Sequence, residues 1–313
     1  MTIDRNLLPF LLLCVIWGTT WIGIKAGVEA VPPLFFAGTR FMTAGFVMLA
    51  ACLLRGRMAP VARRDWPRLA STSLLMITFC YAPLFWGMLY VDSGTAAVLE
   101  MSLTPIALMG FALWLGEERF DRRRAGAIVL GICGLLILFG PTAYANLAAP
   151  AAAGASGAMR LLGAGAVAAA ALTYGWGSVV ARPLLRTYPS LEIAGITTFG
   201  GGGALLALSL AFEPGAVPAL SGHWGMAAWS GWLFLVLFGS LVGYTVYMRL
   251  LRDIGATRAG AYAFVSPVVA VLLGMAFFGE HVRPADVAGM AVMLAAAGLA
   301  VLAPPQQPRT ADA

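Results

Sequence analysis

The chain has 313 residues, of which 60% are hydrophobic and only 11% are charged, and its mean hydropathy is +0.86. Ordinary soluble domains contain roughly 45–50% apolar and about 25% charged residues. The composition therefore excludes an ordinary soluble protein and indicates an integral membrane protein. The net charge is +6; the placement of the arginines in the loops, described below, explains it, so nothing here supports nucleic-acid binding.

Ten apolar runs are long enough to cross the hydrocarbon core of a bilayer, which takes about 20 residues of helix. Backbone polar groups inside a bilayer must find partners within their own segment, so we expect every run to be helical. The runs are 7–26, 34–54, 69–89, 95–115, 125–142, 161–181, 190–211, 226–248, 257–279 and 285–303. The sequence thus predicts an all-α integral membrane protein with ten transmembrane helices.

The second half of the chain repeats the first. The stretch 95–124 returns from Arg258 onward, displaced by 162 to 163 residues, and keeps a hydroxyl residue before a proline in Thr104-Pro105 and Ser266-Pro267. Such internal duplication defines the architecture. Five spans per copy is an odd number, so the second copy enters the membrane from the opposite side. We therefore predict two inverted five-helix repeats, a common construction of secondary transporters.

The domain boundaries follow from the repeat. We assign the first repeat to 7–142, a linker to 143–160, the second repeat to 161–303, and a disordered cytoplasmic tail to 304–313. The linker is rich in Ala, Gly and Pro and nearly free of charge, which suits a flexible connection.

The basic residues predict the orientation, because short cytoplasmic loops collect Lys and Arg. With the N-terminus inside, sixteen of the 20 basic residues fall on the inner side, and the exceptions are Lys25, Arg40, Arg160 and Arg283. Both termini are therefore predicted to be cytoplasmic. The four cysteines each lie alone in an apolar run, so neither a disulfide nor a metal site is expected.

Several of these residues together resemble a known family. They are Trp17-Gly18, Lys25, Arg40, Pro105 and Gly116-Glu117 in the first copy, and Trp176-Gly177, Pro267 and Gly279-Glu280 in the second. Lys25 and Arg40 have no basic equivalent in the second copy. This set resembles the EamA repeats of the drug/metabolite transporter (DMT) superfamily over about residues 7–303. The resemblance implies ten transmembrane helices around a central cavity, and export of amino acids or other small metabolites, or of toxic organic ions, across a bacterial inner (plasma) membrane.

Glu100 is the clearest candidate for a transport site. A carboxylate in a membrane span costs about 2.5–3.5 kcal/mol on insertion scales and usually marks an ion or substrate pathway. It lies roughly 8 Å inside the outer end of its span, and Thr104 shares its face. Pro105 frees the carbonyl of Met101. A structural carboxylate paired with a neighbouring helix is the alternative.

Arg40 lies at a similar depth, about 9 Å inside the outer end of the second span. Two interpretations remain open. In the first, Arg40 and Glu100 form a salt bridge that only neutralises both charges, and the family's arginine at this position favours a structural role. In the second, Glu100 receives an ammonium group and Arg40 a carboxylate, which would suit an amino acid.

The second copy contributes Tyr262 at the position equivalent to Glu100, with Ser266 on its face and Pro267 after it. We expect helix breaks at Pro105 and Pro267. The aromatic candidates for a cavity wall are Trp17, Tyr81, Trp176 and Tyr244, for which ordinary packing or an interfacial belt is the alternative.

Two classes of function remain. The first is a secondary carrier that exports small metabolites by alternating access, with Glu100 binding substrate or exchanging a proton; organic-cation efflux is the alternative. The second class is a non-transport protein, either an intramembrane enzyme or a lipid-translocating protein. No Walker motif is present, so ATP-driven transport by this chain is not expected. No catalytic or metal cluster lies at membrane depth, so we expect no enzyme and no cofactor. The partners are then the bilayer and a small-molecule substrate, in a monomer or a homodimer.

Overall fold

A computed structural model describes residues 5–91, 93–148, 157–278 and 283–302. The first repeat forms these elements: α1 (Leu7–Val28), α2 (Pro33–Leu54), η1 (Arg63–Asp65), α3 (Trp66–Ser73), η2 (Leu74–Thr78), α4 (Phe79–Gly87), α5 (Ser93–Trp114) and α6 (Arg122–Ala148). The second repeat forms α7 (Gly157–Thr187), α8 (Ser190–Phe212), α9 (Ala216–Ala219), α10 (Met226–Phe234), η3 (Leu235–Tyr244), α11 (Thr245–Ile254), α12 (Ala256–Ala259), α13 (Tyr262–Phe278) and α14 (Pro284–Val301).

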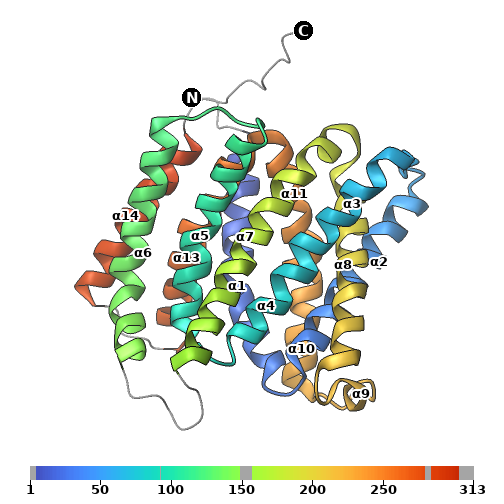
Figure 1. The fold of residues 1–313 in the computed structure, drawn as a ribbon, viewed down its shortest axis with the longest axis horizontal. Coiled ribbons are helices and arrows are strands. Elements are labelled where there is room, and N and C mark those ends of the chain that lie inside the picture. Colours follow the sequence, from blue (N-terminus) through green and yellow to red (C-terminus); the bar gives the residue numbers. More distant parts are fainter. Residues whose placement is uncertain (1–4, 92, 149–156, 279–282, 303–313) are drawn as a thin grey trace. The chain divides into compact units, whose positions relative to one another are not determined.

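The regular structure of the described residues is entirely helical, without a strand (Figure 1). Ten helical segments are long and apolar enough to cross a membrane, and each one covers one of the ten predicted runs. The prediction of an all-α membrane protein with ten spans is therefore confirmed. Several spans run further than expected: the third already begins at Arg63, the eighth continues to Ile254, and the linker predicted at 143–160 is helical at both ends. Residues 149–156 and the predicted tail lie outside the described residues.

The chain divides into two compact units, and each unit takes segments from both repeats. Unit 1 contains residues 1–82 and 180–253, and unit 2 contains residues 83–179 and 254–313. The second and seventh spans meet in unit 1, and the fifth and tenth spans meet in unit 2. Equivalent members of the two copies therefore pack against each other.

In unit 1 the pair α2 and α8 lies side by side over its whole length (Figure 1). Glycines allow the two backbones to touch. A Cβ atom added at Gly38 would lie 2.7 Å from the backbone nitrogen of Leu206, and one added at Gly45 would lie 2.3 Å from that of Phe199. The residue numbers rise along α2 while they fall along α8, so the two helices are antiparallel. Small residues at such contacts are the usual device for close packing of membrane helices.

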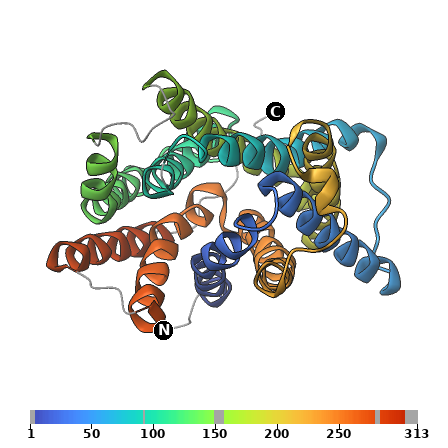
Figure 2. The same ribbon diagram turned by 90° about the horizontal axis from the view of Figure 1, so that it is seen from below.

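Unit 2 uses the same device for α6 and α14 (Figures 1 and 2). A Cβ atom added at Gly134 would lie 2.9 Å from the carbonyl oxygen of Gly289. The reverse holds too, since one added at Gly289 would lie 2.9 Å from the carbonyl oxygen of Gly134. The antiparallel pairing of equivalent spans in unit 1 is the relation that inverted repeats require.

Two carboxylates fasten the ends of α2 and α8. Glu213 follows α8 and accepts hydrogen bonds from the first backbone N–H groups of α2, at Leu34 and Phe35, both at 2.9 Å. At the other end Glu192, fully buried in the first turn of α8, accepts one from the backbone nitrogen of Ala59 at 3.1 Å. A negative charge at a helix N-terminus is favourable because it meets unsatisfied N–H groups and the positive end of the helix dipole.

The third and eighth spans share a further feature. Each contains a π-helix, η2 in the third span and η3 in the eighth, and both lie in unit 1. π-Helices are rare and are found frequently at functional sites. Their occurrence at matching places in the two copies directs attention to the residues around them.

Candidate functional site

Among the candidate residues of unit 1, Arg40 is the charged one, and its side chain is buried. It points from α2 and is only 4% exposed. Its guanidinium carbon lies 4.2 Å from the ring centroid of Phe41 and 5.4 Å from that of Tyr81. Aromatic faces attract a cation, more strongly where water is absent. Within the described residues Arg40 forms no ion pair with a carboxylate, and its Nε atom has no hydrogen-bond acceptor.

Trp17 joins this group through the π-helix η3. Its indole Nε1 donates a hydrogen bond to the carbonyl oxygen of Gly239 at 3.4 Å, and its ring lies 5.1 Å from that of Tyr247. A Cβ atom added at Gly243 would lie 2.7 Å from the same Nε1 atom. One added at Gly239 would lie 3.8 Å from Nη1 of Arg40. Trp17 and Arg40 therefore approach the same glycine-lined face of η3.

Tyr244 connects the two π-helices. Its side chain is 3% exposed, and its hydroxyl donates to the sulfur of Met76, in η2, at 3.5 Å. Ser240 lies one turn before Tyr244 and is completely buried, yet its hydroxyl has no partner among the described residues. Buried hydroxyls are nearly always hydrogen-bonded in folded proteins. Ser240 thus offers an unused polar group in the element that Arg40 and Trp17 approach.

Glu100 lies on α5 in unit 2 and is partly exposed. Its carboxylate makes no hydrogen bond or ion pair with any described residue. Thr104, one turn further along α5, is 3% exposed. The helix continues past Pro105 to Trp114. Since Arg40 belongs to unit 1, a meeting of Glu100 with Arg40 depends on the arrangement of the units and stays a prediction.

The ninth span is interrupted, although not at its proline. α12 ends at Ala259 and α13 begins at Tyr262. Hydrogen bonds between residues three apart in the chain, such as the one from Ala263 N to Gly260 O at 3.1 Å, bridge the gap. Pro267 lies inside α13, which continues to Phe278. Neither Pro105 nor Pro267 ends its helix; the interruption falls at Gly260 instead, where a Cβ atom would lie 2.4 Å from Cδ1 of Leu108 in α5.

This interruption places Tyr262 at the first turn of α13. Ser266, one turn later, is 2% exposed, and its hydroxyl has no partner among the described residues. Leu108 lies one turn beyond Thr104 on α5, so the close contact at Gly260 brings α5 against the interrupted span within unit 2.

Trp176 is accounted for by ring packing. It lies on α7, is 40% exposed, and stacks on Phe111 of α5 with ring centroids 5.7 Å apart and an interplanar angle of 20°. Trp114 completes the cluster at 6.4 Å. Offset stacking of this kind stabilises a helix contact. Trp17 and Trp176 occupy equivalent positions in the repeats, yet they have different surroundings.

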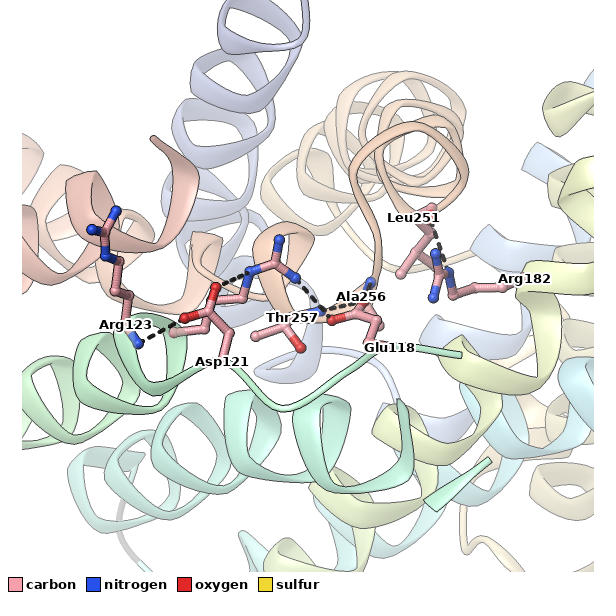
Figure 3. A network of polar contacts seen from close by, with 8 residues as sticks. Glu118, Asp121, Arg123, Arg182, Leu251, Ala256 and Thr257 are labelled. Atoms are coloured by element: carbon pink, nitrogen blue, oxygen red, sulfur yellow. Dashed lines mark hydrogen bonds and ion pairs between the residues drawn. The ribbon is translucent and has the colours of Figure 1, made fainter. Parts of the chain in front are cut away.

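A second buried arginine, Arg124, shows how charges in unit 2 are stabilised. Its guanidinium lies 3.4 Å from the carboxylate of Glu118 and 3.7 Å from that of Asp121. Glu118 also accepts a hydrogen bond of 2.6 Å from the backbone nitrogen of Ala256, the first residue of α12 (Figure 3). The side chains of Arg124 and Glu118 are 3% and 5% exposed. This network holds the turn after α5 against the start of the ninth span.

The structure thus sorts the sequence-derived candidates by unit. Trp17, Arg40, Tyr81 and Tyr244 lie in unit 1, around the π-helices, whereas Glu100, Thr104, Tyr262, Ser266 and Trp176 lie in unit 2. Sequence reasoning missed Ser240 and the roles of Glu118 and Glu192. A carboxylate three residues after a helix-preceding proline, as in Pro189 and Glu192, is a signal that could have indicated a helix-capping group. In the part of the chain that is described, no group of three or more His, Cys, Asp or Glu side chains could hold a metal.

Known proteins share both the sequence pattern and the fold. The EamA-like transporter family matches residues 6–140 and 161–302. The uncharacterized inner membrane transporter YedA of Escherichia coli K12 is 30% identical over 311 residues, covering 95% of this chain and 92% of YedA. The uncharacterized transporter YoaV of Bacillus subtilis is 26% identical over 278 residues, covering 89% of this chain and 90% of YoaV. One crystal structure superimposes with a TM-score of 0.77 at 20% identity, over 95% of this chain and 96% of the other. The chain therefore belongs to the EamA-like transporter family and is a multi-pass membrane protein.

Proposed function

We propose that this protein is a secondary carrier that exports amino acids or closely related metabolites across a bacterial inner membrane, with both termini in the cytoplasm. The observation that carries the proposal is the buried Arg40, which has aromatic neighbours and, among the described residues, no carboxylate partner. In this proposal Arg40 binds the carboxylate of the substrate, and Glu100 is the carboxylate that we expect to interact with its ammonium group during transport.

The physical argument concerns the cost of an isolated charge. A cation inside a membrane protein is expensive unless an anion or several hydrogen-bond acceptors compensate it. Contact with Phe41 and Tyr81 supplies part of this compensation, about 2 kcal/mol for a desolvated pair. A substrate carboxylate would supply the rest through two parallel hydrogen bonds to the guanidinium.

The surroundings of Arg40 suit a reversible site. Trp17 and Tyr81 provide ring surfaces for an apolar side chain, and Ser240 provides a hydroxyl without a partner among the described residues. Each compact unit combines segments of both repeats, and alternating access in carriers built from such repeats is largely a rocking of one bundle against another.

The test is uptake into proteoliposomes by the purified full-length protein, with labelled amino acids and, for each one, the matched amine that lacks the carboxylate and the matched acid that lacks the amine. We expect the amino acid to be preferred by at least tenfold over both analogues. Arg40→Gln should abolish this preference over the amine, and Glu100→Gln should abolish it over the acid. Unchanged selectivity in both variants would overturn the assignment and favour a structural role for both charges.

Organic-cation efflux is the second candidate, and Glu100 favours it, since its carboxylate has no partner among the described residues. The same assay separates the two functions. A cation exporter would transport the amines best, would need Glu100 and would tolerate Arg40→Gln. Proton coupling is tested by repeating the uptake with an imposed pH gradient. A response to the gradient that disappears in Glu100→Gln would assign the proton to this carboxylate.

A further inference from the structure

Unit 1 contains a polar hollow that the transport proposal does not use. It has a volume of about 520 Å³ and lies between the start of α3 and the end of α7. Its lining comprises two arginines, one carboxylate, two prolines, a leucine and a threonine, namely Arg64, Asp65, Pro67, Arg68, Pro183, Leu184 and Thr187. We propose that this hollow binds the phosphate group of an anionic membrane lipid.

The two arginines are available for a ligand. Arg64 and Arg68 are exposed, and among the described residues neither guanidinium forms an ion pair or a hydrogen bond. The one carboxylate among the lining residues, Asp65, already has a partner, because it accepts a hydrogen bond of 2.8 Å from the hydroxyl of Tyr188. The lining still has a net charge of +1, and Asp65 is the group that a bound anion must avoid.

The walls of the hollow are held in place by hydrogen bonds. The Tyr188 hydroxyl that donates to Asp65 also accepts a bond of 3.0 Å from the backbone nitrogen of Ala62. Glu192 accepts one from the backbone nitrogen of Ala59. The loop before α3 is thus fastened to the corner between α7 and α8. A site on a backbone that is already held in place loses less entropy when a ligand binds.

The position of the hollow favours a lipid over a soluble phosphate ester. The third span begins at Arg63 and the sixth ends at Thr187, so the hollow lies at the end of two spans, where we expect the lipid headgroups. Trp66 beside it is 53% exposed, and Leu54 at the end of α2 is 86% exposed. Tryptophan is typical of the membrane interface. Exposed apolar side chains at this level provide a surface for acyl chains.

The chemistry also fits. A guanidinium group matches the oxygens of a phosphate with two parallel hydrogen bonds. Basic pockets between transmembrane helices on the cytoplasmic side are a recurring way to bind anionic headgroups.

The experiment measures lipid binding by the full-length protein in detergent, by native mass spectrometry and by the shift of its melting temperature, with phosphatidylglycerol and with phosphatidylcholine. The test variant is Arg64→Gln/Arg68→Gln. The matched control is Arg57→Gln/Arg63→Gln, which removes the same charge from the same loop, at exposed arginines outside the hollow. Arg64→Lys/Arg68→Lys serves as a second variant that keeps the charge.

We expect saturable binding of phosphatidylglycerol in preference to phosphatidylcholine, weakened roughly 10- to 30-fold in the test variant and less than threefold in the control. The lysine variant should retain an intermediate affinity. Equal loss in the test variant and the control would show general surface attraction and would overturn the site. If glycerol 3-phosphate alone bound as tightly and with the same dependence on Arg64 and Arg68, the ligand would be a soluble ester, and the lipid assignment would be wrong.

Discussion

The two units bury an arginine in opposite ways. In unit 2, Arg124 faces the carboxylates of Glu118 and Asp121, and Glu118 in turn caps the start of α12. In unit 1, Arg40 is equally buried but is surrounded by aromatic rings, with no carboxylate partner among the described residues. A charge that only holds a fold together is best compensated permanently, whereas a charge that binds and releases a ligand must be compensated temporarily. The contrast is the one expected if Arg124 belongs to the scaffold and Arg40 to the proposed substrate site.

The largest expected effect is on the scaffold of unit 2. Glu118→Ala leaves Arg124 and the first N–H of α12 buried without this carboxylate, and removal of one partner of a buried pair costs about 3–5 kcal/mol. We expect the melting temperature in detergent to fall by on the order of 10 °C. Glu118→Gln keeps an acceptor oxygen for the backbone nitrogen of Ala256, so its melting temperature should fall less. An unchanged melting temperature in Glu118→Ala would show that the network does not stabilise unit 2.

The second effect concerns Arg40 and should appear in transport rather than in stability. Arg40→Gln removes the group that we expect to bind the substrate carboxylate, so uptake of the preferred amino acid should fall about 100-fold, which corresponds to about 2.7 kcal/mol. The melting temperature should stay the same or rise, because no described carboxylate loses a partner. A large loss of stability instead would place Arg40 in the same class as Arg124 and remove the contrast.

A smaller effect tests the glycine contact that holds unit 1 together. A Cβ atom at Gly202 would lie 2.6 Å from the backbone nitrogen of Met42, which cannot move aside easily. Gly202→Ala should therefore destabilise the protein by about 1–3 kcal/mol. The neighbouring Gly203 is the matched control, because a Cβ atom there meets nothing within 4 Å. Gly203→Ala should be neutral or slightly stabilising in thermal unfolding, since alanine favours a helix. Equal effects in both variants would contradict this packing.

The smallest effect belongs to a charge pair at the surface of unit 2, in which the Arg283 side chain is 55% exposed and the Asp286 side chain 11%. Arg283 and Asp286 are 2.7 Å apart at the start of α14, and the carboxylate raises the pKa of the Arg283 guanidinium above its usual value. Solvent screens exposed pairs of this kind. We expect Arg283→Ala to leave the melting temperature unchanged within the error of measurement. A shift comparable to that of Glu118→Ala would mean that burial does not distinguish the charges of this protein.

The spans could be predicted from the sequence because a 20-residue apolar run is a direct physical requirement of the bilayer. The duplication could be predicted because the two copies keep the same residues at matching places, such as Pro105 and Pro267. The sequence also placed Arg40 and Glu100 at a similar depth. It did not indicate what surrounds them, because Tyr81 approaches Arg40 only through the packing of α2 against its neighbours.

Other features of the structure had no local signal in the sequence. Glu118 and Ala256 are separated by 138 residues, and nothing in the composition of either segment predicts that they meet. The π-helices were also invisible, because an apolar segment such as Leu235–Tyr244 satisfies the bilayer equally well with α-helical or π-helical hydrogen bonds.

The π-helices have a consequence for the rotational register of the third and eighth spans. One residue inserted into an α-helix turns everything beyond it by about 100°, and a π-helix absorbs such an insertion locally. Deletion of one residue from Leu235–Tyr244 would restore regular winding and carry Tyr247 around the helix axis, away from its contact with Trp17. η2 lies in the third span and η3 in the equivalent span of the second copy. In both spans, therefore, the face presented at one end does not fix the face presented at the other end. A span of this kind can present different faces at its two ends while both ends remain helical.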